Sequence, residues 1–136
     1  MTPSSSPMRD TTLPAWHHIA RSRDTRALAT LVADDCVFHS PVVHTPQRGK
    51  ALTVAYLSAA FEVFFNDSFR YVREVVSEHD AVLEFEVTID GIAVNGVDML
   101  RCDAAGRLVE FKVMLRPLKA VNIVHQKMGE MLQRRA

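Results

Sequence analysis

The spacing of apolar residues changes once along the chain, from a helical to a strand period. Over residues 50–65 apolar side chains recur every three or four positions, which predicts a long helix. From residue 69 the period becomes two, and over residues 83–89 Leu, Phe, Val and Ile alternate with Glu and Thr. That alternation is typical of a strand with one buried face.

The remaining elements follow from turn and capping signals. Pro14 suits the first turn of a helix, and Asp24 or Thr25 suits the N-cap of a second one. Asp90-Gly91 is a hairpin turn between two alternating runs. The sequence therefore predicts two short helices, a short strand over residues 36–40, a turn over 46–49, the long helix, strands near 69–75, 83–89, 92–101 and 108–115, and a closing helix over 119–135.

This order predicts an α+β fold, in which helices pack on the concave side of a curved antiparallel sheet. The chain of 136 residues suits one domain, which we expect to span residues 13–136. Residues 1–12 are rich in Pro, Ser and Thr and are expected to form a disordered tail. A curved sheet under helices encloses a cavity, and its apolar inner positions suit an apolar small molecule.

Charge and composition exclude several classes of function. Sixteen Lys and Arg balance sixteen Asp and Glu, so the chain lacks the basic field that nonspecific nucleic-acid binding requires. No segment approaches the roughly 18 apolar residues of a membrane span, and Cys36 and Cys102 form no CxxC motif. We expect reduced thiols, a cytoplasmic location and, without paired ligand motifs on one element, no metal site.

Several short motifs, in this order, resemble the nuclear transport factor 2-like superfamily. They are Ala33-Asp34-Asp35, Ser40-Pro41, Arg48-Gly49, and the stretch from Val97 to Arg101 followed by Gly106 to Glu110. The resemblance covers about residues 13–117 and is closest to the SnoaL-like and ketosteroid-isomerase-like branch. It implies a cone-shaped sheet around a deep apolar pocket, a homodimer, and functions that range from isomerases and cyclases to non-catalytic binding domains.

The catalytic residues of ketosteroid isomerases transfer only in part. Their general base, an Asp before a Pro, corresponds to Ser40, and their oxyanion-hole Tyr corresponds to Trp16. Their protonated Asp, the second oxyanion donor, corresponds to Asp98. Because one of three roles is kept, the resemblance argues against steroid isomerisation.

Asp98 is the strongest catalytic candidate. It shares a strand face with Gly96 and Leu100, and apolar walls would raise its pKa above the ordinary value of about 3.9. In the alternative, structural reading, Asp98 pairs with an arginine or caps a backbone N–H. Replacement by Asn is expected to preserve stability at pH 7 in the first case and to reduce it strongly in the second.

Two further residues are candidates for acid–base chemistry. Histidine is a common acid–base residue, although strand alternation points His39 outward if Phe38 and Ser40 point inward. Tyr56 could present a hydroxyl to the cavity. The expected pocket lining, besides these catalytic candidates, is Trp16, Phe38, Ser40, Leu83, Phe85, Val87, Phe111 and Val113.

Two functional hypotheses remain open at this point. The first is a cofactor-independent isomerase, cyclase or dehydratase that moves protons on an apolar carbonyl compound, with Asp98 assisted by His39 or Tyr56. The second is a non-catalytic ligand-binding or dimerisation module, which Ser40 at the base position favours. Homodimerisation is expected through the outer sheet face, which bears Thr88, Val97, Met99 and Met114.

Overall fold

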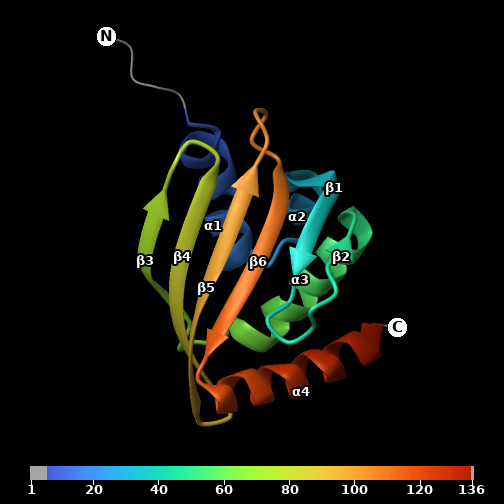
Figure 1. Ribbon diagram of the computed structural model, residues 1–136, viewed down its shortest axis with the longest axis vertical. Helices are drawn as coiled ribbons and strands as arrows, with labels where there is room; N and C mark the ends of the chain where they lie inside the picture. The colour runs from blue at the N-terminus through green and yellow to red at the C-terminus, as the bar shows by residue number, and fades with distance from the viewer. Residues whose placement is uncertain (1–5, 136) are drawn as a thin grey trace.

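One six-stranded sheet forms a layer, and helices cover one of its faces in the computed structural model, which describes residues 6–135 (Figure 1). The strand order is β2-β1-β6-β5-β4-β3. In chain order the elements are a short helical segment η1 (Met8–Thr12), α1 (Leu13–Ser22), α2 (Thr25–Leu31), β1 (Val32–His39), β2 (Gln47–Arg48), α3 (Lys50–Phe64), β3 (Arg70–Val76), β4 (Asp80–Ile89), β5 (Ile92–Cys102), β6 (Leu108–Arg116) and α4 (Leu118–Arg135). The α+β fold predicted from the sequence is confirmed.

The predicted meander is present, with β3, β4, β5 and β6 paired antiparallel in sequence order. Asp90 and Gly91 connect β4 to β5, and both have positive φ, 50° and 78°. Those angles are the ones that a two-residue hairpin turn requires, and Asp-Gly adopts them at low cost. The predicted helix caps also form: Asp24 accepts hydrogen bonds from the backbone N–H groups of Arg26 and Ala27.

The first strand differs from its prediction in length and pairing. β1 begins at Val32, four residues before the predicted start, and runs parallel to β6, with Phe38 opposite Phe111. Gln47 and Arg48, predicted to be a turn, form the short strand β2 on the free edge of β1. These pairings join residues that are distant in sequence, so local pattern did not indicate them.

The N-terminal segment is the main correction to the sequence analysis. Residues 6–12 belong to the folded domain rather than to a disordered tail, and residues 1–5 lie outside the described residues. The Met8 side chain is fully buried, and the Thr12 hydroxyl donates to the Gly106 carbonyl at 2.6 Å. The expectation failed because the segment, although mostly polar, buries the Met8 side chain and makes several long-range hydrogen bonds, including one from the Met8 N–H to the Glu78 carbonyl.

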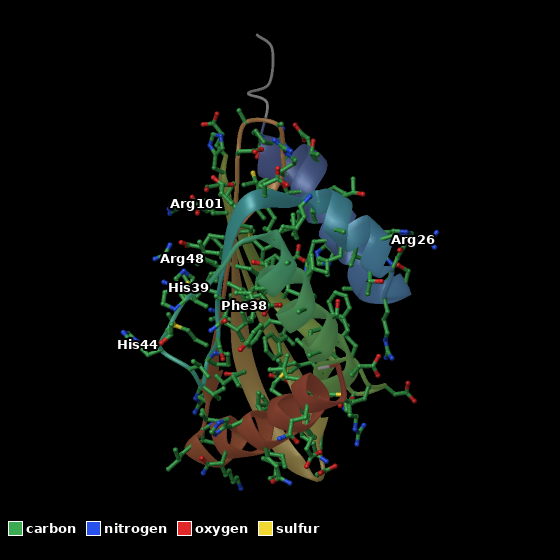
Figure 2. The ribbon with its side chains drawn as sticks, turned by 90° about the vertical axis from the view of Figure 1, so that its right-hand side faces the viewer. Arg26, Phe38, His39, His44, Arg48 and Arg101 are labelled. Atoms are coloured by element: carbon green, nitrogen blue, oxygen red, sulfur yellow. The ribbon has the colours of Figure 1, made fainter. Side chains whose placement is uncertain are left out.

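The core lies between the concave face of the sheet and the helices. Leu83, Phe85 and Val87 are buried on this face, whereas the intervening Glu84 and Glu86 point away, as the alternation predicted. At β1 the same parity holds, and Figure 2 shows Phe38 on the helix side of the strand and His39 on the opposite side. The concave face therefore collects the side chains from which a buried site can be built.

Candidate active site

A chain of hydrogen bonds connects three elements on the concave side. The Tyr71 hydroxyl, from β3, donates to Asp98 Oδ2 on β5 at 2.6 Å. The Trp16 indole Nε1–H, from α1, donates to the Tyr71 hydroxyl oxygen at 3.0 Å. Asp98 therefore receives a phenolic hydrogen bond, and the phenol is itself held in place by an indole.

Strand alternation brings Asp98 to this position. Its neighbours across the sheet are Leu83 on β4 and Val113 on β6, both buried apolar residues. Gly96, two positions earlier, lets the sheet accept a large ring, because a Cβ there would lie 2.5 Å from Phe85 Cζ. The carboxyl group is thus surrounded by apolar side chains on the same face.

The pKa of Asp98 is raised to about 7, because the effect of burial, which raises it, exceeds that of the hydrogen bond from Tyr71, which lowers it. The residue is 7% exposed, and no lysine or arginine among residues 6–134 forms an ion pair with it. The pKa shift predicted from the sequence is confirmed, and the arginine-paired alternative is wrong. A carboxyl with this pKa is present in both protonation states at neutral pH, as general acid–base chemistry requires.

Tyr71 remains a hydrogen-bond donor at neutral pH. Its burial and then the nearby Asp98 charge raise the pKa of its hydroxyl well above the ordinary value. Because the hydrogen bond from Tyr71 is made to Oδ2, the second carboxyl oxygen, Oδ1, is not engaged by either aromatic donor.

Asp98 lies on the wall of an almost entirely apolar cavity of about 30 Å³. That volume is close to the space that one water molecule occupies in the liquid. The cavity cannot admit a cyclic ligand unless aromatic side chains rotate. Its lining is Trp16, Leu57, Ala60, Phe61, Phe64, Phe65, Phe69, Phe85, Asp98, Phe111 and Val113.

The structure brings some of the sequence-predicted residues to this cavity and leaves others outside it. Trp16, Phe85, Phe111 and Val113 join Asp98 in the lining. The remaining buried residues of the expected pocket, Phe38, Leu83 and Val87, lie in the surrounding core without lining the cavity.

Three polar candidates lie outside the cavity. The Tyr56 ring packs 5.5 Å from the Phe38 ring, between ring centroids. His39 is on the outer face, with Nε2 3.6 Å from a Glu110 carboxyl oxygen. Ser40 lines a surface groove, where its hydroxyl oxygen accepts from the Val42 N–H at 3.1 Å. A catalytic role for His39 or Tyr56 stays a prediction without support from this geometry.

Sequence reasoning missed Tyr71 as the partner of Asp98. The available signal was its position two residues after Phe69, at the start of the alternating region. It also missed that α3 and the following loop supply Phe61, Phe64, Phe65 and Phe69 to the cavity. Helical spacing identifies a buried stripe, but it does not say which part of the stripe borders a cavity.

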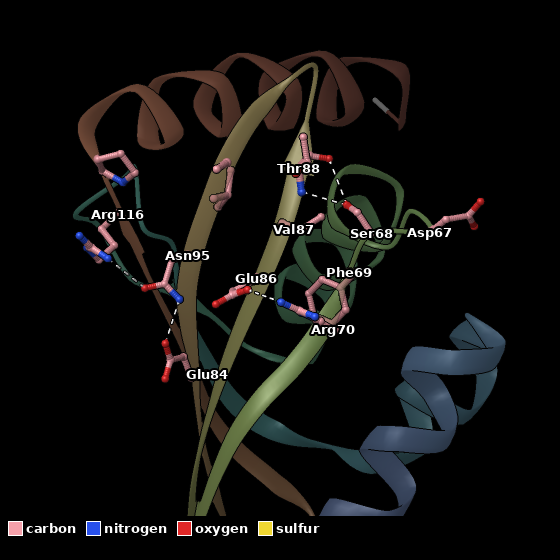
Figure 3. Close-up of a pocket in the computed structure, with 13 residues that line it drawn as sticks. Asp67, Ser68, Phe69, Arg70, Glu84, Glu86, Val87, Thr88, Asn95 and Arg116 are labelled. Carbon is pink, nitrogen blue, oxygen red and sulfur yellow. Dashed lines mark hydrogen bonds and ion pairs between the residues drawn. The ribbon is translucent and has the colours of Figure 1, made fainter.

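A second hollow, of about 700 Å³, lies on the outer face of β3, β4 and β5 (Figure 3). Its charged groups already bind one another: Arg70 donates to Glu86 at 2.9 Å, and Asn95 donates to Glu84 at 3.0 Å. None of these carboxylates is isolated from water and cations as Asp98 is. The inner cavity is therefore the candidate active site.

The described residues contain no group of three or more His, Cys, Asp or Glu side chains placed to hold a metal ion. Within the same part of the chain, no helix combines the length and apolar character that crossing a membrane requires.

Comparison with known proteins agrees with this architecture. A steroid delta-isomerase from Pseudomonas aeruginosa superposes with a TM-score of 0.83 at 34% identity, covering 99% of this chain and 95% of that chain. An uncharacterised bacterial protein with a cystatin-like fold from Silicibacter pomeroyi DSS-3 has a TM-score of 0.81 at 26% identity, with 88% and 84% coverage. A protein from Shewanella denitrificans OS-217, proposed to be a SnoaL-like polyketide cyclase, shares the fold at 19% identity, with a TM-score of 0.63 and 94% and 98% coverage.

No curated protein sequence matches the chain. The model of the SnoaL-like domain, by contrast, matches residues 14–111, which include α1, the sheet up to Phe111, and all three members of the Trp16–Tyr71–Asp98 chain. These likenesses confirm the nuclear transport factor 2-like fold and its SnoaL-like and ketosteroid-isomerase-like branch. The chain belongs to the family of SnoaL-like domains.

Proposed function

We propose that the protein is a cofactor-independent isomerase, cyclase or dehydratase that acts on an apolar carbonyl compound, with Asp98 as the acid–base residue. The observation that carries the proposal is a buried carboxyl of pKa about 7 on the wall of an aromatic cavity. The similarity of the chain to a steroid delta-isomerase supports a reaction at a carbon next to a carbonyl group.

The proton transfers follow from the two protonation states of Asp98. The ionised carboxylate takes a proton from a carbon next to the substrate carbonyl through Oδ1, which leaves an enolate. The resulting carboxylic acid returns that proton to a different carbon, which completes an isomerisation, or gives it to a departing hydroxyl, which completes a dehydration. A pKa near 7 makes both directions accessible at neutral pH.

Tyr71 and Trp16 would act as positioning residues in this scheme. The Tyr71 hydroxyl fixes the orientation of the carboxyl through Oδ2, and the Trp16 N–H fixes the hydroxyl. The hydrogen bond from Tyr71 also favours the ionised carboxylate, which limits how far burial raises the pKa of Asp98.

A test of this function is enolisation of a cyclic ketone. We expect the protein to accelerate exchange of α-hydrogens of 2-tetralone for deuterium, and to isomerise a β,γ-unsaturated steroid ketone if the cavity opens far enough. The rate should rise as Asp98 ionises, around pH 7. Asp98→Asn should abolish the acceleration, whereas Glu86→Gln on the outer face should retain it.

The second candidate is a binding module without turnover. The observation that favours it is Ser40, which lies outside the cavity. Ser40 occupies the position that corresponds to the general base of the ketosteroid isomerases. In that case the same ketones bind, but their exchange rate equals that of buffer at every pH. Exchange that persists in Asp98→Asn would instead contradict the assignment of Asp98.

The homodimer expected from the sequence remains part of this proposal. On the outer face of the sheet Val97 and Met99 are half-buried and Met114 is 51% exposed, so an apolar strip runs between charged residues. Sedimentation at tens of micromolar should show a dimer, because affinities near micromolar persist at that concentration. A monomer under those conditions would contradict it.

A further inference from the structure

A surface groove adjoins the inner cavity. It has a volume of about 440 Å³ and lies between α1, the end of α3 and the start of β3. Phe65 and Phe69 line both the groove and the cavity, so their rings form the wall between the two spaces. The two rings meet edge to face, with their centroids 4.7 Å apart.

Tyr71 also connects the two spaces. It lines the groove, while its hydroxyl donates to Asp98 on the wall of the cavity. A ligand that displaces the Phe65 and Phe69 rings from the groove side would therefore reach Asp98 alongside Tyr71. This route would give a ligand too large for the inner cavity access to Asp98, because the groove volume of about 440 Å³ is far larger than the roughly 30 Å³ of the cavity behind the rings.

The groove is positively charged. Arg21, Arg23, Arg70 and His17 line it, and no Asp or Glu does. Two of these basic side chains have carboxylate partners: His17 Nε2 is 2.5 Å from Glu74, and Arg70 is 2.9 Å from Glu86.

The other two cations, Arg21 and Arg23, have no carboxylate within ion-pair distance among residues 6–135. The nearby Asp24 caps α2 instead. Arg23 donates to the backbone carbonyl of Phe65, so one unneutralised guanidinium is attached to the wall itself. Guanidinium groups bind carboxylates and other oxyanions through paired hydrogen bonds.

From this arrangement we infer that the groove binds the anionic head group of an apolar ligand, which Arg21 and Arg23 hold while the apolar body passes between Phe65 and Phe69 toward Asp98. The inference rests on the proposed function for what happens at Asp98, and it narrows the substrate class to apolar carbonyl compounds that carry one anionic group. Binding in the groove itself does not require turnover.

Two dyes with the same aromatic skeleton test this inference. 8-Anilinonaphthalene-1-sulfonate carries one negative charge, and N-phenyl-1-naphthylamine is its neutral counterpart. Trp16 is the only tryptophan of the chain and lines the inner cavity, so its emission reports a dye that binds next to the wall. We expect the sulfonate to bind about tenfold more tightly than the neutral dye, to quench Trp16, and to weaken as salt rises.

Charge-removing variants locate the head group. The double variant Arg21→Gln, Arg23→Gln should lose about tenfold in affinity for the sulfonate and should keep its affinity for the neutral dye within about twofold. Arg48→Gln is the matched control, since Arg48 lies on β2, away from the groove, and it should change neither dye. Because Arg23 has a positive φ of 57° at the end of α1, Arg23→Lys, which keeps the charge, separates loss of charge from disturbance of the helix end.

Equal affinity of the two dyes, an unchanged sulfonate affinity in the double variant, or a bound sulfonate that leaves Trp16 emission unchanged would each overturn the inference. The dye-binding measurements test whether the groove binds an anionic head group. Deuterium exchange separately tests the proposed function of Asp98.

Discussion

The two faces of the sheet hold carboxyl groups in opposite environments. On the outer face, Glu86 lies 2.9 Å from the Arg70 guanidinium and Glu84 lies 3.4 Å from that of Arg73. On the inner face of the neighbouring strand, Asp98 accepts a hydrogen bond from Tyr71 and has no cationic partner in the described part of the chain. Burial raises the pKa of Asp98 to about 7.

The comparison shows that the face of the sheet, rather than the residue type, decides what an acid in this sheet can do. An exposed carboxylate beside a guanidinium stays ionised and contributes little, because water screens the pair. A buried carboxyl without a cation loses hydration, so its proton becomes easier to keep and its pKa moves into the physiological range. Of the carboxyl groups compared, Asp98 on the inner face is the one whose pKa is raised to about 7.

The largest expected effect comes from removing an inner aromatic residue. Phe85→Ala should lower the free energy of unfolding by about 3–5 kcal/mol, because Phe85 is 1% exposed and packs against Phe64 and Phe69. Val75→Ala, at a position 58% exposed on β3, should cost less than about 1 kcal/mol. Urea unfolding measures the loss of unfolding free energy in both variants. Equal losses would contradict the difference between the two faces.

The pH dependence of stability tests Asp98 directly. Its pKa is about 7 in the folded protein and 3.8 in the unfolded chain, so the native state binds more protons between these values. The protonated form therefore stabilises the fold fully below about pH 3.8, and the benefit is lost as pH rises through about 7.

Asp98→Asn removes this dependence. The free energy of unfolding of the wild type, relative to the variant, should fall by roughly 3–4 kcal/mol between pH 4 and 7. Thermal or urea unfolding across that range measures the difference. Glu86→Gln should show no such trend, and a constant difference between wild type and Asp98→Asn would mean that the carboxyl is not desolvated.

A smaller effect is expected at the hydrogen bond that moderates Asp98. Tyr71→Phe removes the phenolic donor, so the pKa of Asp98 should rise above its wild-type value. Tyr56→Phe is the matched control, because Tyr56 lies outside the cavity and should leave that pKa unchanged. A ¹³C NMR titration of the Asp98 carboxyl carbon measures this pKa in both variants. A change of the Asp98 pKa in Tyr56→Phe, and none in Tyr71→Phe, would make Tyr56 the site residue.

The smallest effect is expected on the outer face. Glu86→Gln breaks the ion pair with Arg70, in which both side chains are largely exposed, and should change stability by less than about 1 kcal/mol. The change should shrink further at 1 M salt, where the Debye length is about 3 Å. A salt-insensitive loss of several kcal/mol would show that outer carboxylates are as isolated as Asp98.

Much of this architecture could be predicted because local rules suffice for it. The alternation over β4 placed Phe85 inward and Glu86 outward, and the Asp90-Gly91 turn joined β4 to β5. Counting by two along β5 put Asp98 on one face with Gly96 and Leu100, and the resemblance to the ketosteroid-isomerase-like branch assigned that face to the pocket. Apolar neighbours on that face then predicted its raised pKa. The alternation requires only the period of a strand, and the pKa shift requires only the cost of burying a charge.

Tertiary structure alone decided which groups meet Asp98 and how much space surrounds them. Tyr71 reaches the carboxyl from β3, two strands away, and Trp16 reaches Tyr71 from α1, 55 residues earlier in the chain. The cavity shrinks to about 30 Å³ because phenylalanines from α3 and its following loop fill the cone. Such contacts depend on how helices dock on a twisted sheet, and no local period in the sequence specifies that docking.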